Sequence, residues 1–375
     1  MSRRSSSIRL TGWVGLVLVL MGALAVTAFA LTRGDGPKPP KRSLPAAIHA
    51  ALVGPRVAGV TATVTFQQHL LPNSSSFASQ ASVSGATGRV WVAGGHARIR
   101  LSTPMGTVQA AFDGRRITLF VPRTHTAYVF TVPAHRSSGH AGHHAVPSTA
   151  QIAKALARVS RVAVLSGADP GNVAGRPAYT VRVSPRHDAG LLGAAELAWD
   201  AQHGTPLRFA IYPKGSSTAA IELAVTKIHY GAIPASTLAL HLPPGTQIVP
   251  VHRPAKQDAK HAGAVQPAQA APSIVAPATA AGLPRTELRT LDVRGHAGRL
   301  VVYGHGLAAV VVLAQPAVKA GGLAQLPTTS VAGTTGRVLE TTLGSVVRFT
   351  RGGVTYTVAG FQPVETVKNV AAALN

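Results

Sequence analysis

Apolar and polar positions alternate along much of the chain after residue 57, and this pattern predicts β-strands. In residues 96–102, isoleucine and leucine alternate with arginine, as expected for a strand with one buried face. Gly94-Gly95 and Asp113-Gly114 separate pairs of such runs and have the composition of tight hairpin turns. The pattern therefore predicts a mainly β protein with consecutive antiparallel hairpins.

One segment in the middle of the chain has a helical pattern instead. Behind Ser148, apolar residues recur every three or four positions, which places them on one helix face. Ser148 and Gln151 have the spacing of a capping box, and Gly167 is the expected end of the helix. A second short amphipathic helix is expected just before the C-terminus.

The N-terminus has the pattern of a membrane segment. Residues 11–31 carry no charge and follow three arginines within residues 1–10. A helix of this length rises about 31 Å, which matches the apolar core of a bilayer. We expect a transmembrane signal anchor with a cytoplasmic tail of residues 1–10. A signal peptide cleaved near Ala28-Phe29-Ala30 is the alternative, and it would make the protein secreted. Both interpretations place the remaining chain outside the cytoplasm, at the cell membrane or beyond it.

Composition divides the rest of the chain into four parts. Residues 32–56 are basic and rich in proline and predict a tether. Residues 57–251 contain most of the strand pattern and predict a ligand-binding domain. Residues 252–284 are rich in alanine, proline and glutamine and predict a disordered linker. Residues 285–375 predict a small α+β domain.

The charge balance favours anionic partners. The chain has 36 Lys+Arg against 12 Asp+Glu, a formal net charge of +24. Such a surplus attracts polyanions, for example anionic lipid headgroups or wall polymers. The cations are scattered rather than gathered with stacking aromatics, so no nucleic-acid partner is expected. Because there is no cysteine, disulfides, thiolate metal sites and cysteine nucleophiles are excluded.

No convergent catalytic set is visible in the sequence. HExxH, GxSxG, Walker A and GxGxxG motifs are absent, and the carboxylates are thinly spread. The one cluster of potential metal ligands is a loop with His135, His140, His143 and His144, but no carboxylate stands beside it. It is interpreted as a metal-binding loop or as a flexible, pH-sensitive loop, with the second favoured. We therefore expect a protein that is not an enzyme and that has no cofactor and no metal site.

Several of these segments together resemble a known superfamily. Their order is similar to that of the LolA-like lipoprotein-carrier superfamily, and the C-terminal part resembles the RseB/MucB regulators of the sigma-E pathway. The matching segments are residues 113–130, 175–185, 197–212 and 242–249 in the first unit, and 300–316 and 352–374 in the second. A departure is His305, which stands where the family often has aspartate.

The resemblance implies a fold and two functions. The fold would be an open, strongly curved antiparallel β half-barrel, capped by helices around an apolar cavity, with a small α+β domain. Members bind lipoprotein acyl chains or, among the regulators, an anti-sigma factor and lipid-like signals. The candidates for the cavity are the aromatic residues of the strands: Trp91, Phe112, Phe120, Tyr128, Phe130, Trp199, Phe209 and Tyr212. Because neighbouring side chains of a strand alternate between faces, some of these candidates must instead belong to ordinary cores.

Two functions from different classes remain as expectations. The first is a non-enzymatic extracytoplasmic protein that holds a lipid or lipoprotein acyl segment in the half-barrel. The alternative is an envelope-stress regulator that binds the ectodomain of a membrane anti-sigma factor. A hydrolase or metal-dependent enzyme is the third and least favoured hypothesis.

Overall fold

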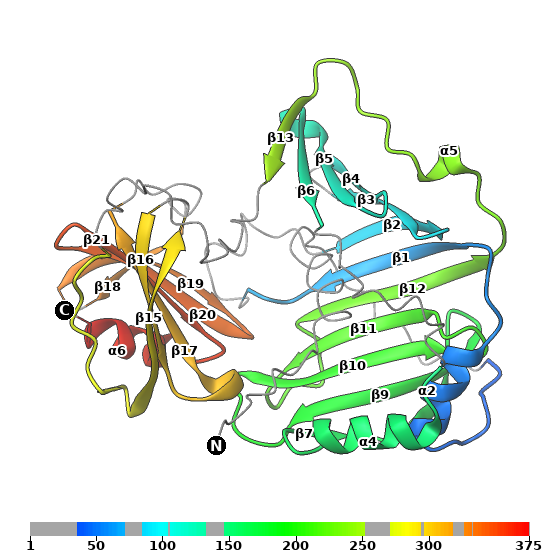
Figure 1. The fold of residues 1–375 in the computed structure, drawn as a ribbon, viewed down its shortest axis with the longest axis horizontal. Coiled ribbons are helices and arrows are strands. Elements are labelled where there is room, and N and C mark those ends of the chain that lie inside the picture. Colours follow the sequence, from blue (N-terminus) through cyan, green and yellow to red (C-terminus); the bar gives the residue numbers. More distant parts are fainter. Residues whose placement is uncertain are drawn as a thin grey trace, which may run out of the picture.

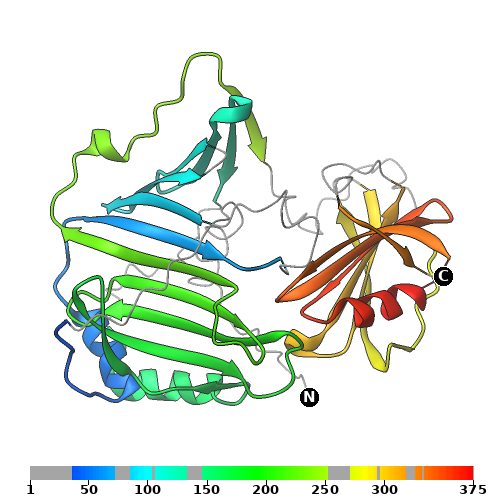
Figure 2. The same cartoon turned by 180° about the vertical axis from the view of Figure 1, so that it is seen from behind.

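The computed structural model describes residues 36–71, 85–103, 106–132, 146–251, 271–293, 296–317, 326–331 and 333–374. These residues form two units, each built on one sheet (Figures 1 and 2). The fold is mainly β, as predicted. None of the helices found in these ranges is both long and apolar enough to cross a membrane. The predicted anchor (residues 11–31) and the histidine loop (residues 135–144) lie outside the described ranges.

The first unit is one curled sheet, which has 13 strands in the described part of the chain. Its order is β13-β6-β5-β4-β3-β2-β1-β12-β11-β10-β9-β7, with β8 also paired to β9. All pairings are antiparallel except that of β13 with β6. The strands are β1 (Val60–Gln68), β2 (Gly85–Ala93), β3 (His96–Thr103), β4 (Gly106–Phe112), β5 (Arg116–Val121), β6 (Thr126–Thr131), β7 (Ala163–Leu165), β8 (Asp169–Val173), β9 (Arg176–Pro185), β10 (Leu192–Asp200), β11 (Pro206–Pro213), β12 (Ile221–Tyr230) and β13 (Gln247–Val251).

The second unit has eight strands among its described residues, in the order β14-β15-β16-β17-β21-β20-β19-β18. They are β14 (Thr279–Ala280), β15 (Leu283–Val293), β16 (His296–Tyr303), β17 (Val310–Pro316), β18 (Thr328–Val331), β19 (Thr334–Thr341), β20 (Gly344–Arg351) and β21 (Val354–Gly360). The C-terminal helix α6 (Val364–Ala372) packs Val367 and Val370 into the core of this sheet. The predicted α+β character of residues 285–375 agrees with this arrangement.

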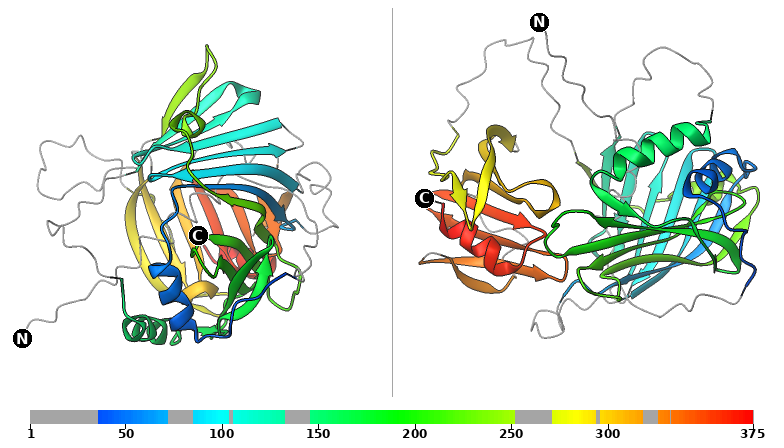
Figure 3. Two further views of the ribbon diagram at one scale, coloured as in Figure 1. Left: turned by 90° about the vertical axis from the view of Figure 1, so that its right-hand side faces the viewer. Right: turned by 90° about the horizontal axis from the view of Figure 1, so that it is seen from below.

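The first sheet bends so that β2 to β6 stand away from the plane of β9 to β12 (Figures 1 and 3). This is the curled half-barrel that the resemblance implies. The chain leaves β12 through the short helix α5 (Ala235–Leu238) and returns along the sheet to β13. Short 3₁₀ turns, η1 (Pro122–Thr124) and η2 (Gly306–Ala308), follow β5 and β16.

Two helices pack over β9 and β10 at one end of the first sheet. They are α2 (Leu44–Val53) and α4 (Thr149–Val159), and they share a core with Tyr179 and Trp199. The capping box at Ser148 is present as predicted. The helix ends at Val159 rather than at Gly167, because the chain continues into strand β7, which pairs with β9.

The structure divides the chain differently from composition at two places. Residues 36–56, assigned to the tether, contain α2 and lie against the sheet, with a hydrogen bond from the Tyr179 hydroxyl to the Pro40 carbonyl of 2.6 Å. Residues 271–284, assigned to the linker, contain β14 and pack Ile274 and Ala276 against the second core. Composition misses both because short apolar contacts are diluted among prolines and alanines.

Candidate functional site

One face of the first sheet is apolar across many strands. Directly paired residues of neighbouring strands share a face. The register therefore lines up one continuous apolar row across six strands, from β1 to β6: Val60, Val92, Ala97, Phe112, Ile117 and Phe130. The next row on the same face holds Ala62, Val90, Ile99, Ala110, Leu119 and Tyr128. We call this surface of β1 to β6 the apolar face.

The apolar face is filled at its centre and open towards β4, β5 and β6. Near β1 and β3, Val64 and Leu101 are almost fully buried and belong to one core cluster. Towards the edge, by contrast, Leu119 and Tyr128 are half-buried and Phe130 is 37% exposed. Helices α2 and α4 pack at the other end of the sheet. A stretch of apolar side chains therefore remains accessible on strands β4 to β6.

The eight aromatic candidates divide between the two faces. Three of them lie on the apolar face: Phe112, Tyr128 and Phe130. Phe209 pairs with Leu223 and lies on the same face of the neighbouring strands. Trp199 also follows this face, but it is 6% exposed beneath α2 and is part of a core.

The other three candidates, Trp91, Phe120 and Tyr212, lie on the opposite face. Trp91 contacts the guanidinium of Arg98 at 5.7 Å. Phe120 is 3% exposed, with its ring edge-on to His125. For these three the prediction of an inner-face position is wrong, because strand alternation directs their side chains to the other side of the sheet.

Sequence reasoning missed aliphatic residues on the same side of the sheet as the apolar face, in β2 and in β10. Val92 is 40% exposed and Leu197 is 38% exposed, and both share the face of the aromatic residues. A search restricted to aromatic residues overlooks them. The signal that identifies them is their position along the strand. Each stands an even number of positions from a buried residue of its strand and therefore lies on the same face as that residue.

The opposite face of β9 to β12 is held by a ladder of ion pairs. Arg182, Glu196, Arg208 and Glu222 stand on four successive strands, with three N–O distances of 2.6–2.8 Å. Burial opposes ionisation of Glu196, but hydrogen bonds from Arg208, Arg182 and Tyr212 outweigh it and lower the pKa of Glu196. Tyr212 donates to Glu196 at 2.9 Å and is therefore a member of this ladder.

The second unit has an apolar surface of its own. On the face of its sheet away from α6, a hollow of about 430 Å³ is lined almost entirely by carbon atoms. Leu307, Val311 and Phe361 at this hollow are 39–49% exposed. Val311 pairs with Ala359, and both point away from the core that holds Val312 and Val358. We call this surface the C-terminal hollow.

The described residues contain no group of three or more histidines and carboxylates placed to hold a metal ion. The histidine loop lies outside these ranges, so its interpretation stays a prediction.

The fold is thus a curled half-barrel sheet joined to a smaller sheet with one helix. The chain is similar in fold to several solved structures. MucB in complex with MucA(peri) has a TM-score of 0.43 at 19% identity over 88% of this chain and 96% of that chain. The MucA/MucB complex of Pseudomonas aeruginosa has a TM-score of 0.45 at 18% identity over 88% and 98%. A LolA superfamily protein from Nitrosomonas europaea has a TM-score of 0.25 at 8% identity over 53% and 99%. No family model and no curated protein matches the chain.

Proposed function

We propose that this protein is an extracytoplasmic, non-enzymatic binding protein that regulates a membrane protein partner. The partner class is the ectodomain of an anti-sigma factor, as the sequence resemblance to RseB/MucB regulators implies. The observation that carries the proposal is the presence of two accessible apolar surfaces, one on each unit: the apolar face and the C-terminal hollow.

Two separate surfaces favour a protein segment over a single acyl chain. Residues as apolar as Leu307 and Phe361 cost free energy when exposed, so contiguous apolar patches commonly mark binding sites. An acyl chain in the half-barrel would use only the first surface. A protein segment with two groups of apolar anchors would use both, and each fully buried anchor contributes about 1.5–3 kcal/mol.

The second candidate function is binding of a lipid or lipoprotein acyl segment. It is supported by the accessible aromatic and aliphatic side chains of the apolar face, Phe130 and Val92 among them. Burial of acyl chain gains about 0.8 kcal/mol per CH₂ in a membrane, so a protein surface must match it closely for reversible transfer.

Two double variants separate these candidates. Phe130→Ser with Val92→Ser removes exposed members of the apolar face, and Leu307→Ser with Val311→Ser removes exposed members of the C-terminal hollow. Full-length protein is purified from its host, co-purified lipid is measured by mass spectrometry, and binding to purified anti-sigma ectodomains of that host is measured by calorimetry. For the regulator, both double variants are expected to weaken ectodomain binding by roughly tenfold or more.

A matched control is Ile248→Ser with Val162→Ser, because these side chains are 61% and 65% exposed and lie away from both surfaces. This control should leave binding unchanged. If lipid co-purifies, is lost only in the Phe130/Val92 variant, and no ectodomain binds, the lipid function replaces the regulator. If all three double variants bind alike, neither surface is the binding site.

A further inference from the structure

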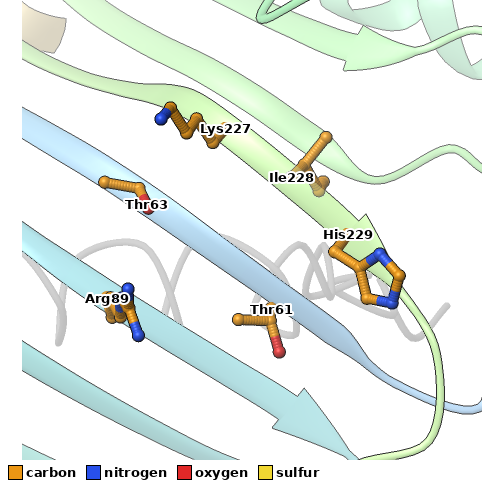
Figure 4. Close-up of a pocket in the computed structure, with 6 residues that line it drawn as sticks. All are labelled: Thr61, Thr63, Arg89, Lys227, Ile228 and His229. Carbon is orange, nitrogen blue, oxygen red and sulfur yellow. The ribbon is translucent and has the colours of Figure 1, made fainter.

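A polar hollow lies on the other side of the first sheet from the apolar face. It has a volume of about 350 Å³ and lies over β1, β2 and β12 (Figure 4). Its polar side chains are Thr61, Thr63, Arg89, Lys227 and His229. Two cations, an imidazole and two hydroxyls therefore line one small depression.

The strand register explains why these side chains gather. Lys227 pairs with Thr63, which pairs with Arg89, so the three form one row across three strands. His229 pairs with Thr61 in the next row on the same face. Figure 4 shows the threonine side chains of β1 between those of the neighbouring strands.

A β-bulge in β12 turns the two basic residues of that strand towards the hollow. The pairing shifts by one residue between Thr63 and Val64, which leaves Thr226 as the extra residue. If the ladder continued without a bulge, Thr226 would pair with Thr63, and Lys227 would pair with Ala62 and point into the apolar face. With the bulge, Ile228 takes that apolar position and Lys227 faces the hollow.

No residue that the structure describes neutralises the cations of the hollow. Among the described residues, Arg89, Lys227 and His229 have no ion pair, and the hydroxyls of Thr61 and Thr63 have no hydrogen-bond partner.

The charges around the hollow are also positive. Arg98 and Arg100 stand on the same face of the next strand, because they pair with Trp91 and Arg89. The carboxylate of Glu222, further along β12, is occupied by Arg208 at 2.6 Å. The field at the hollow therefore favours an anion.

We propose that this hollow is a binding site for a phosphate group. Arg89 and Lys227 would neutralise the charge, and the hydroxyls of Thr61 and Thr63 with the His229 ring would donate hydrogen bonds to phosphate oxygens. A phosphate monoester or diester matches this set of donors, whether it is free or part of a phospholipid headgroup. The site is independent of the function proposed above, because it lies on the opposite face of the sheet.

The test compares two variants of equal net charge. Arg89→Ala with Lys227→Ala removes two cations from the hollow, and Arg115→Ala with Lys154→Ala removes two exposed cations elsewhere. Binding of the full-length chain to inorganic phosphate is measured by calorimetry. Binding to phosphatidylglycerol-containing vesicles, relative to phosphatidylcholine vesicles, is measured by co-sedimentation. Circular dichroism checks that both variants are folded.

The hollow variant is expected to lose affinity by roughly tenfold or more, while the control variant changes little. Loss of inorganic phosphate binding supports a site for free phosphate. Site-dependent binding to anionic vesicles without binding of inorganic phosphate supports a headgroup site. Equal loss in both variants, or no binding to either probe by the unaltered chain, overturns the proposal, since attraction would then follow net charge alone.

Discussion

At the scale of single residues, Asp200 is a carboxylate held by several hydrogen-bond donors. Its side chain is fully buried at the end of β10. It accepts hydrogen bonds from Arg176 Nε at 2.8 Å, from the Tyr230 hydroxyl at 2.8 Å, and from the backbone amides of Gln202 and His203. Burial opposes ionisation, but these donors outweigh it and lower the pKa of Asp200 from 3.8 to about 2.

This pKa shift predicts an acid-sensitive contribution to stability. Because the pKa is lower in the folded chain than in the unfolded one, the stabilisation is present above about pH 4 and is lost as the pH falls towards 2. Its size is roughly 2 kcal/mol. Asp200→Asn should lower the free energy of unfolding at pH 7 and flatten its decline between pH 4 and 2, as measured by denaturant titration.

The matched control for Asp200 is Asp188→Asn, because Asp188 is 64% exposed and its partners are the exposed Lys214 and the backbone amide of Gly190. This control should change the free energy of unfolding by less than about 1 kcal/mol. Equal effects of the two substitutions would contradict the structural role given to Asp200.

At the scale of elements, the β12 bulge determines on which face of the sheet the side chains of that strand lie. Because the bulge accommodates the extra residue Thr226, Ile228 stays on the apolar face beside Ala62 and Lys227 stays on the polar one. A single bulge thereby serves both the core and the polar hollow. This is a reason to expect that the bulge is a required feature of the fold rather than a local irregularity.

Insertion of one alanine after Val225 should therefore be far more harmful than Thr226→Ala. With the one-residue bulge kept, the insertion would pair Lys227 with Ala62 and direct Lys227 and His229 into the apolar face, or it would unpair the end of β12. We expect a loss of about 3–5 kcal/mol in the free energy of unfolding, because a charge would be buried without a partner. Thr226→Ala keeps the bulge and removes only a hydrogen bond of 3.3 Å to the Thr63 carbonyl, so a loss near 1 kcal/mol is expected. Thermal unfolding followed by circular dichroism measures both, and similar losses would refute the prediction.

At the scale of the whole molecule, two backbone hydrogen bonds between described residues join the units. The amide of Leu191 donates to the Phe361 carbonyl at 2.6 Å, and the amide of Thr342 donates to the Leu70 carbonyl at 2.7 Å. Gly190 lies beside the first contact with φ of +63°, and a Cβ there would overlap the Phe361 carbonyl. The glycine is thus required by the close approach of the two units.

Gly190→Ala is expected to weaken the contact between the units. Its radius of gyration, measured by small-angle X-ray scattering, should increase because the Phe361 backbone must move away. Gly215→Ala is the matched control, since Gly215 also has positive φ at +74° but has open space around it. Each substitution carries the left-handed backbone cost of about 1–2 kcal/mol, so only the first should also separate the units. An unchanged radius in both would show that this contact does not hold the units together.

The sequence was sufficient for the strands but not for their faces in space. Hairpin turns at Gly94-Gly95 and Asp113-Gly114 were predicted correctly, because turn chemistry and strand alternation are local. The capping box at Ser148 is local as well. Trp91 and Phe120 were assigned to the wrong face, because residue type alone does not determine which alternate positions of a strand point towards the core.

What the sequence determined by itself is the mainly β character, the hairpin turns and the strongly basic character, since these depend on neighbouring residues and on composition. Only the tertiary structure decided which aromatic residues share the apolar face, that Arg89 meets Lys227 across β1, and that Leu191 contacts Phe361. The physical reason is that pairing register, bulges and contacts between units join positions far apart along the chain. Their energies depend on which partner is present, and that information is absent from any short stretch of residues.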